Sequence, residues 1–433
     1  MGRLGNFLKI RGRGKAKKKH LLVLDIGTEF VKALILKLEE KVSDDKEVKQ
    51  QGIIIGVGRQ RQMPDHMLAG AVTDIEGVSL TCQAAINQAI RQVRAKPSRA
   101  VIGISGEFIK GASTNFVYQR ENPAEAIGLA ELQNIIQKIQ WRAFDRMRRQ
   151  LAYETCRSEI EIKPINALLT EIKIDSYQVT NPLGFQGKEI FLSIFTVYAP
   201  LVHLRAIEAI AAQLNLELLS IVAEPYALTR TSCFNPTAGA IFIDIGGGTT
   251  DIALIRQNKV EGIKSFGLAG QTFTRRLGKM FELDLVEAER IKMRYAHKRL
   301  SQNVQRKIRG VLKNDLGIWL NGVELVLEEF NQAEYFPPQI FLCGGGSLLP
   351  EIKSILKKEE IRQHWLGKFP FSQAPQVNFI QSKQINNIVD QTNSLGGPEF
   401  ITPMALASLS LEIVGNEKKV LPPVLRRVMR IMR

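Results

Sequence analysis

The fold is decided by the stretch Gly239-Ala-Ile-Phe-Ile-Asp-Ile-Gly-Gly-Gly-Thr-Thr-Asp251, which Ile252-Ala-Leu-Ile255 continues. An apolar run that ends in a carboxylate and glycines, and then resumes, is typical of two buried strands joined by a tight turn. The same order occurs near the start of the chain, where His20-Leu-Leu-Val-Leu-Asp-Ile-Gly-Thr28 leads into Val31-Lys-Ala-Leu-Ile-Leu36. A repeat of this kind predicts two similar halves. Gly52–Gly58 supplies a third strand, so the opening is a β-meander without the helix of a Rossmann turn.

The two turns have the composition of a phosphate site. Glycines let backbone N–H groups approach a polyphosphate closely, and a hydroxyl of Thr28, Thr249 or Thr250 can add a donor. Asp25 and Asp244, at the bases of the turns, would hold the waters of a Mg²⁺ ion. Taken alone, the first turn is as readily an ordinary hairpin. The second, with its three glycines and two threonines, is harder to explain in that way.

A third glycine-rich loop follows a predicted strand at Gln339–Cys343. It reads Gly344-Gly-Gly-Ser-Leu-Leu-Pro350 and precedes a predicted helix at Glu351–Lys357. Backbone without side chains can pass against a flat base or a phosphate, and the N-terminus of a helix favours anions. A plain strand-to-helix turn remains the alternative.

In this order the three motifs resemble those of the actin-like ATPase superfamily, which includes heat-shock chaperones and sugar kinases. Asp25–Thr28 resembles its first phosphate motif, Asp244–Asp251 its second, and Leu342–Pro350 its adenosine motif. The resemblance implies an α/β protein with the actin-like ATPase fold, in which two similar β-sheet and helix halves enclose a nucleotide cleft. The implied ligands are ATP and Mg²⁺.

The resemblance also implies roles for single residues. Glu224 would position the attacking water, while Glu289 and Lys292 would hold the ribose or base, unless they form only a solvated ion pair. Glu29 departs from the pattern, because an acid beside the first turn would face phosphate charge; we expect this to affect hydrolysis more than binding. The predicted metal ligands are Asp25 and Asp244, and the predicted nucleotide contacts are Gly27, Thr28, Gly246, Gly247, Gly248, Thr249, Gly270, Glu289, Lys292, Gly344, Gly345 and Gly346.

Within the superfamily, the chain resembles most closely the bacterial cell-division FtsA family. Asn181-Pro-Leu-Gly-Phe-Gln-Gly187 and Val101-Ile-Gly-Ile-Ser-Gly-Glu-Phe-Ile109 are similar to the ends of the subdomain that this family inserts. The pilus assembly protein PilM shares that insert. The implied division is a basic arm at 1–19, a first half at 20–98, 181–236 and 391–416, an FtsA-type insert at 99–180, a second half at 237–258 and 331–390, a helical subdomain at 259–330, and a linker with a membrane-targeting helix at 417–433.

The net charge of +16 is concentrated at the two ends of the chain. Residues 1–20 and 418–433 contain Lys and Arg but no acid, which leaves a nearly neutral body and disfavours nucleic-acid binding. On a helical wheel, residues 424–433 place Val, Leu, Ile and Met on one face and four arginines on the other. Such a helix is suited to lie on an anionic membrane; a helix packed on the body or a basic tail is the alternative. FtsA-like proteins are expected to end in a membrane helix, and PilM-like ones are not.

Cysteine spacing and hydropathy exclude several other classes. Cys82, Cys156, Cys233 and Cys343 show no metal or disulfide spacing, and no apolar run is long enough to span a membrane. We therefore expect reduced cysteines and a peripheral protein on the cytoplasmic face of the membrane, at the division site.

The leading prediction is an ATP-binding protein with slow or no hydrolysis that polymerises on the membrane. The family resemblance implies that it binds the C-terminal tail of the tubulin-like protein FtsZ on residues 259–330, and other division proteins besides. A PilM-like pilus adapter is the main alternative. A sugar kinase would need a separate substrate motif, which the sequence does not contain.

Overall fold

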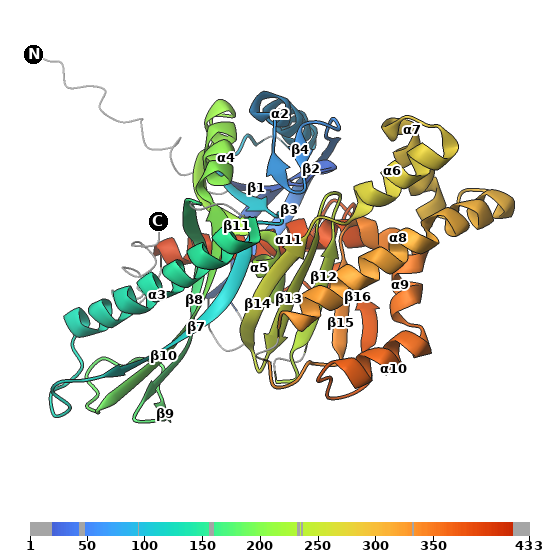
Figure 1. Cartoon of the computed structure of the whole chain (residues 1–433). Helices are drawn as coiled ribbons and strands as arrows, with labels where there is room; N and C mark the ends of the chain where they lie inside the picture. The colour runs from blue at the N-terminus through green and yellow to red at the C-terminus, as the bar shows by residue number, and fades with distance from the viewer. Residues whose placement is uncertain are drawn as a thin grey trace, which may run out of the picture.

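Two β-sheets organise the molecule, one for each copy of the repeat (Figure 1). The computed structural model describes residues 20–42, 48–93, 95–155, 160–231, 234, 237–330 and 333–418. The basic arm at 1–19 and the predicted membrane helix at 424–433 lie outside these residues. No helix within them is long and apolar enough to cross a bilayer.

The first half is built on the predicted meander. β1 (His20–Ile26), β2 (Phe30–Val42) and β3 (Val48–Arg61) are antiparallel, and β6 (Arg99–Ile104) runs parallel to β1. The sheet order is β11-β6-β1-β2-β3-β17, with β11 at Glu217–Ala223 and β17 at Ile388–Asp390. A small hairpin, β4 (Met67–Leu68) and β5 (Ala71–Val72), follows the meander.

The second half repeats this arrangement. β12 (Ala240–Ile245), β13 (Thr250–Arg256) and β14 (Lys259–Phe266) are antiparallel, and β15 (Gln339–Cys343) runs parallel to β12. β16 (Gln376–Phe379) continues the sheet beside β15. The turns after β1 and β12 are therefore equivalent positions of two equivalent sheets, which confirms the predicted actin-like architecture.

Helices cover the first sheet. They are α2 (Ile75–Arg91), α4 (Leu201–Gln213), α5 (Glu224–Thr229) and α11 (Ile401–Lys418). Asp74 caps α2 by accepting a hydrogen bond from the Gly77 N–H at 3.1 Å, so this helix begins at Ile75. α11 contacts β1, β2 and β3, so the end of the described chain returns to the first half.

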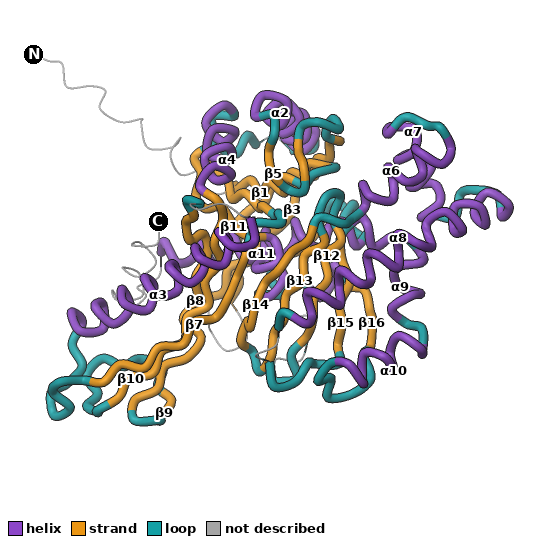
Figure 2. The backbone as a smooth tube through the Cα atoms, in the orientation of Figure 1, coloured by secondary structure: helices purple, strands orange, loops and turns teal. Residues whose placement is uncertain are grey.

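The inserted subdomain forms the narrow arm of the molecule (Figure 2). It consists of β7 (Lys110–Gln119), α3 (Leu129–Thr155), β8 (Ile162–Ile174), β9 (Tyr177–Gln178) and β10 (Glu189–Pro200). The predicted range 99–180 differs from this at both ends. β6 belongs to the first-half sheet, whereas β10 pairs with β7 and β8 and so belongs to the insert.

The insert continues the sheet of the second half. β7 pairs with β14, which gives a nine-stranded order of β16-β15-β12-β13-β14-β7-β10-β8-β9. Because β14 occupies 259–266, the segment 259–330 begins with a strand of this sheet, and its helices start only at Gly270. These are α6 (Gly270–Phe281), α7 (Leu285–Ala296) and α8 (Gln302–Glu328). α9 (Pro350–Leu356) and α10 (Glu359–Lys368) complete this half.

Two large hydrophobic clusters fill the molecule. One contains the buried side chains of β1, β2, β6 and α11 together with one face of β12, β13 and β15, so it joins the two halves. The other contains the opposite face of β12 and β15 and the buried side of α8. The insert has smaller clusters of its own between α3 and its strands. Cys82 and Cys343 are buried and form no disulfide bond within the described residues; Cys156 and Cys233 lie outside those residues.

Candidate functional site

The two glycine turns meet each other between the halves. Gly27 N–H donates to the Phe30 carbonyl at 3.2 Å, and Gly246 N–H donates to that of Thr249 at 2.9 Å, so both turns close in the same way. A Cβ on Gly247 would lie 2.7 Å from Cβ of Glu29, and one on Gly248 would lie 2.6 Å from Oγ1 of Thr28. Side chains at 247 and 248 would therefore push the two turns apart.

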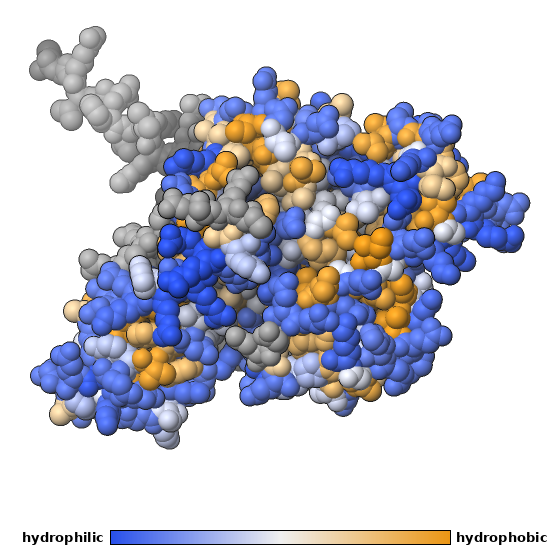
Figure 3. Space-filling model, in the orientation of Figure 1, coloured by the Kyte–Doolittle hydropathy of each residue, from blue (hydrophilic) through white to orange (hydrophobic). Residues whose placement is uncertain are grey.

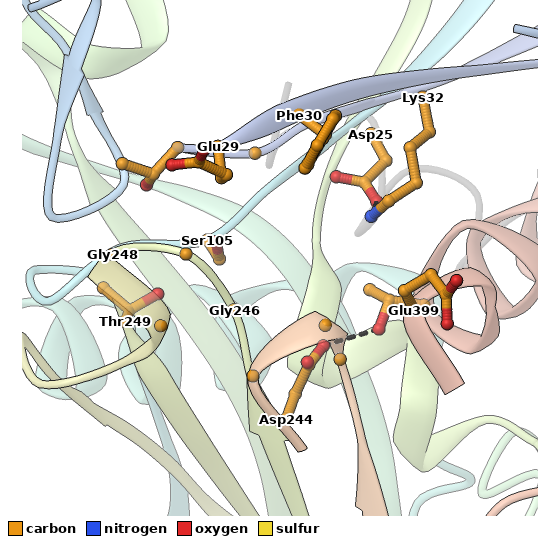
Figure 4. Close-up of a pocket in the computed structure, with 18 of the residues that line it drawn as sticks. Asp25, Glu29, Phe30, Lys32, Ser105, Asp244, Gly246, Gly248, Thr249 and Glu399 are labelled. Carbon is orange, nitrogen blue, oxygen red and sulfur yellow. Dashed lines mark hydrogen bonds and ion pairs between the residues drawn. The ribbon is translucent and has the colours of Figure 1, made fainter. Parts of the chain in front are cut away.

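Buried carboxylates lie behind these turns. Asp25 and Asp244 reach into the pocket from opposite sides (Figure 4). Lys32 Nζ donates to Asp25 Oδ2 at 2.7 Å, and Thr402 Oγ1 donates to Asp244 Oδ2 at 2.5 Å. Glu224 is also buried, and its Oε1 has no hydrogen-bond partner.

Burial raises the pKa of three of the pocket carboxyl groups, those of Glu224, Asp244 and Asp251. Burial, followed by the neighbouring Asp25 and Asp244 carboxylates, raises the pKa of Glu224 well above its usual value. Burial also raises the pKa of Asp244, against the opposing effect of its bond to Thr402. The pKa of Asp251 rises to about 7, again mainly through burial and then through Asp244. Burial alone would lower the pKa of Lys32, but its ion pair with Asp25 outweighs this and raises it.

The third glycine loop closes against the same carboxylates. Gly344 has φ of +82°, and a Cβ there would lie 2.1 Å from Asp244 Oδ1. A short 3₁₀ turn, Gly345–Leu348, then leads into α9. The loop therefore forms one wall of the site, in addition to connecting β15 to α9.

A fourth wall comes from α6 and α7. Gly270 N–H and Gln271 N–H donate to the carbonyls of Gly246 and Gly247, at 3.0 and 2.7 Å. Lys292 pairs with Glu289 at 2.7 Å and also donates to the Gly270 carbonyl at 2.7 Å. Both side chains are buried. The alternative of a solvated ion pair is therefore wrong.

All these walls line one pocket between the two halves. Every member of the final set of predicted metal ligands and nucleotide contacts lines it, as does Glu224. Thr250, which the sequence offered as a further hydroxyl donor, does not. It is buried in the second half, where it accepts from Trp319 Nε1 at 3.0 Å and donates to the Leu268 carbonyl at 2.7 Å.

The pocket also contains residues that the sequence did not predict, among them Phe30, Lys32, Arg59, Glu399 and Thr402. Lys32 had a detectable signal, because it is the single charge in the apolar run 31–36. Arg59 and Thr402 had none, since register and tertiary contact alone bring them to the site. The Glu29 side chain points away from Asp25 and Asp244 (Figure 4). Its carboxylate instead accepts a hydrogen bond from Arg61 Nε at 2.6 Å.

The residues present fit a hydrated magnesium ion and a polyphosphate. Carboxylates enter from both halves, two buried carboxylate oxygens (Glu224 Oε1 and Glu399 Oε2) lack a hydrogen-bond partner, and the glycine turns leave backbone in place of side chains. No group of three or more His, Cys, Asp or Glu within the described ranges forms a full protein cage. Mg²⁺ commonly uses one or two carboxylates and keeps several waters, so two aspartates suffice.

Comparison with known proteins agrees with the motifs. A protein-family model described as "Cell division protein FtsA" matches residues 241–405. FtsA of Pseudomonas aeruginosa is 25% identical over 282 residues, covering 64% of this chain and 61% of that protein. FtsA of Neisseria meningitidis serogroup B is 26% identical over 287 residues, covering 64% and 62%. The chain thus matches less than two thirds of the length of these relatives. The predicted resemblance to FtsA is confirmed.

Among solved structures, a PilM–PilN type IV pilus biogenesis complex is similar, with a TM-score of 0.61 at 17% identity. The match covers 91% of this chain and 98% of that chain. At this identity the similarity shows a common fold, and the fold accommodates the insert as well as the two halves.

Proposed function

We propose that this chain is an FtsA-like, ATP-binding cell-division protein that polymerises at the cytoplasmic membrane and tethers the FtsZ ring. The observation that carries the proposal is the junction of two equivalent glycine turns over carboxylates from both halves, in a chain whose sequence relatives are named FtsA.

In this proposal the turns at 27–28 and 246–249 bind the phosphate chain of ATP through backbone N–H groups. Asp25 and Asp244 hold the waters of Mg²⁺, whose charge would offset that of the phosphates. Glu224 positions the attacking water, and Gly270, Glu289, Lys292 and Gly344–Gly346 enclose the adenosine. Hydrolysis is slow or absent, so nucleotide binding serves to set the conformation of the halves.

The helical subdomain is the proposed dock for the FtsZ tail. Met280, Leu285 and Val286 are exposed there, and Figure 3 shows hydrophobic residues over α6 and α7 on a mostly hydrophilic face. Arg294 on the last turn of α7 supplies positive charge, whereas Arg290 is paired with Glu287 at 3.3 Å. A peptide with apolar anchors and acidic flanks would match this surface.

The proposed membrane anchor is the helix at 424–433, which lies outside the described residues. Its apolar face would enter the head-group region, and its arginines would contact anionic lipid. A single helix of this size binds weakly, so filaments that present many copies would bind strongly.

The deciding experiment is electron microscopy of the full chain on anionic liposomes with ATP, with and without an FtsZ tail peptide. We expect membrane-bound filaments that recruit the peptide. Val428→Glu should abolish liposome binding by destroying the apolar face, whereas exchange of the four arginines for lysine should largely preserve it. If Val428→Glu binds as well as the unaltered protein, the helix is not the anchor.

A pilus adapter is the alternative, and the experiment separates the two. An adapter would keep its membrane association after deletion of residues 420–433 and would form no filaments on lipid. The similarity to the PilM–PilN structure does not favour this role, because it concerns the fold alone.

A further inference from the structure

Arg59 ends a row of three charged side chains that crosses one wall of the pocket. Strand register pairs Asp25 with Lys32 across β1 and β2, and Lys32 with Arg59 across β2 and β3. Directly opposed residues of antiparallel strands share a face of the sheet. All three side chains accordingly lie on the side of the sheet that faces the pocket, and all three line it.

Two neighbours hold Arg59 in place. Its guanidinium carbon lies 3.8 Å from the centre of the Phe30 ring. Its backbone N–H donates to Gln88 Oε1 on α2 at 3.0 Å. Stacking on an aromatic ring restricts the plane of a guanidinium group, which leaves its edge to contact a ligand.

Arg59 differs from the other cations of the pocket in having no acid of its own. The lining contains Lys32, Arg59 and Lys292; Lys32 is paired with Asp25 and Lys292 with Glu289. Arg59 forms no ion pair within the part of the chain that the structure describes, and its buried Nε has no hydrogen-bond partner. Burial lowers the pKa of Arg59, and the nearby Glu399 carboxylate only partly opposes this. Buried donors normally have partners, so the pocket lacks one acceptor.

We propose that Arg59 binds the phosphate chain of the nucleotide, on the face of the pocket formed by β2 and β3. The inference rests on the proposed nucleotide-binding function. A guanidinium group matches phosphate oxygens with two parallel N–H donors. The lining is rich in acids, namely Asp25, Glu29, Glu224, Asp244, Asp251, Glu289 and Glu399. An anionic ligand therefore needs a protein cation that no acid neutralises, and Arg59 is the one that the described pocket supplies.

The test compares ligands with and without phosphates. Calorimetric titration of Arg59→Gln in Mg²⁺ should show the Kd for ADP and ATP raised roughly 10- to 100-fold, the effect of losing one charge-assisted contact. Adenosine, which has no phosphate, should bind Arg59→Gln with the same Kd as it binds the unaltered protein. Arg149→Gln on α3 removes an arginine whose side chain is 76% exposed, and should change none of these values.

Two further measurements separate ligand binding from a structural role. The nucleotide-free Arg59→Gln protein should unfold at the same temperature as the unaltered protein or a higher one, because a half-buried charge without an ion pair among the described residues is removed. Arg59→Lys keeps the charge but loses the two parallel N–H donors of the guanidinium group. Its affinity for ADP and ATP should therefore lie between those of the unaltered protein and Arg59→Gln. A lowered unfolding temperature without nucleotide, or an equal loss of adenosine affinity, would overturn the assignment.

The result also distinguishes this inference from the function on which it rests. If the unaltered protein binds neither ADP nor ATP, the proposed function fails and the assignment of Arg59 fails with it. If the unaltered protein binds both and Arg59→Gln binds them equally well, only the assignment of Arg59 is wrong.

Discussion

Glu29, on the first half, accepts a hydrogen bond from Gln271 Nε2, on the second half, at 3.0 Å. Its other carboxylate oxygen accepts from Arg61 Nε, so the side chain is fixed on both sides. The acid that the sequence placed beside the phosphates as an unfavourable charge instead joins the halves where the turns meet. In Figure 4 it lies away from Asp25 and Asp244.

We expect the hydrogen bond between Gln271 and Glu29 to slow the release of bound nucleotide, because it joins the two halves. Gln271→Ala should release bound nucleotide about tenfold faster, since one hydrogen bond to a charged group is lost across the cleft. Stopped-flow displacement of a fluorescent ATP analogue measures the rate. Gln363→Ala is the control, because Gln363 makes the same type of bond to Glu359 within α10, at 2.7 Å. Equal release rates for all three proteins would refute a role of the contact in release.

Asp25 and Asp244 should account for the magnesium dependence of ATP binding. Asp244→Asn removes the charge while keeping an acceptor for Thr402, and Asp25→Asn is its counterpart in the first half. Each should weaken ATP binding in Mg²⁺ by about tenfold or more, and should reduce the difference between titrations with Mg²⁺ and with EDTA. If both variants keep the full Mg²⁺ effect, the metal site lies elsewhere.

Glu224 should matter to hydrolysis and not to binding. Glu224→Gln keeps the volume of the side chain, so ATP affinity should change by less than about twofold, while any phosphate release should fall by about 10²-fold or more. Positioning a water stabilises the transition state more than the bound ground state. A single-turnover assay with labelled ATP measures the step. A large loss of affinity with unchanged turnover would contradict the role.

Asp251 should make the nucleotide-free protein less stable as pH rises. Its pKa is about 7 in the folded chain, above its ordinary value, so the folded state holds a proton that the unfolded state releases. The contribution of Asp251 to the free energy of unfolding is therefore fully present below the ordinary aspartate pKa and is lost by about 1.4 kcal/mol per pH unit until the pH reaches the folded value. Thermal unfolding at pH 5.5 and 8 should show a smaller change in Asp251→Asn than in the unaltered protein. Asp145→Asn, a substitution on the surface of α3, should leave the difference in unfolding temperature between the two pH values unaltered.

Two glycines should respond to alanine in opposite directions. Gly344→Ala forces a side chain onto a left-handed backbone and against Asp244, and should lower the free energy of unfolding by about 1–3 kcal/mol. Gly310 lies inside α8, where a Cβ would meet no atom within 4 Å. Gly310→Ala should therefore raise stability by about 0.5–1 kcal/mol. Denaturant unfolding of both variants checks the pair, and a loss at both positions would mean that Gly310 has a contact of its own.

The sequence predicted the site best where chemistry and backbone are local. Asp25 and Gly27 lie within one turn, as do Asp244 and Gly246, so the motif itself carries the geometry. Thr402, in contrast, is far along the chain from the Asp244 carboxylate that it contacts, and it begins no recognisable motif. Arg59 reaches the pocket only because β3 pairs with β2 in one particular register. Residues of this kind are fixed by pairing and packing, which a single sequence does not display.

The predicted boundaries of the insert, 99 and 180, were wrong for a related reason. β6 and β10 are both apolar strands, and nothing in their composition states which sheet each joins. β6 is placed by its parallel pairing with β1, and β10 by its long antiparallel pairing with β7. Strand existence was therefore predictable, whereas strand partnership was not.

The junction of β7 with β14 gives the insert a mechanical character. Its chain leaves the first half after β6 and returns to it at α4, yet its sheet is bonded to the second half through Gly262 with Ala112 and Ile263 with Gly111. A separation of the halves would therefore have to be accommodated at this short junction or at the connections of the insert to β6 and α4. The insert is thus attached to both halves at one end. A small opening of the cleft would move the far end of the insert through a larger distance than the opening itself.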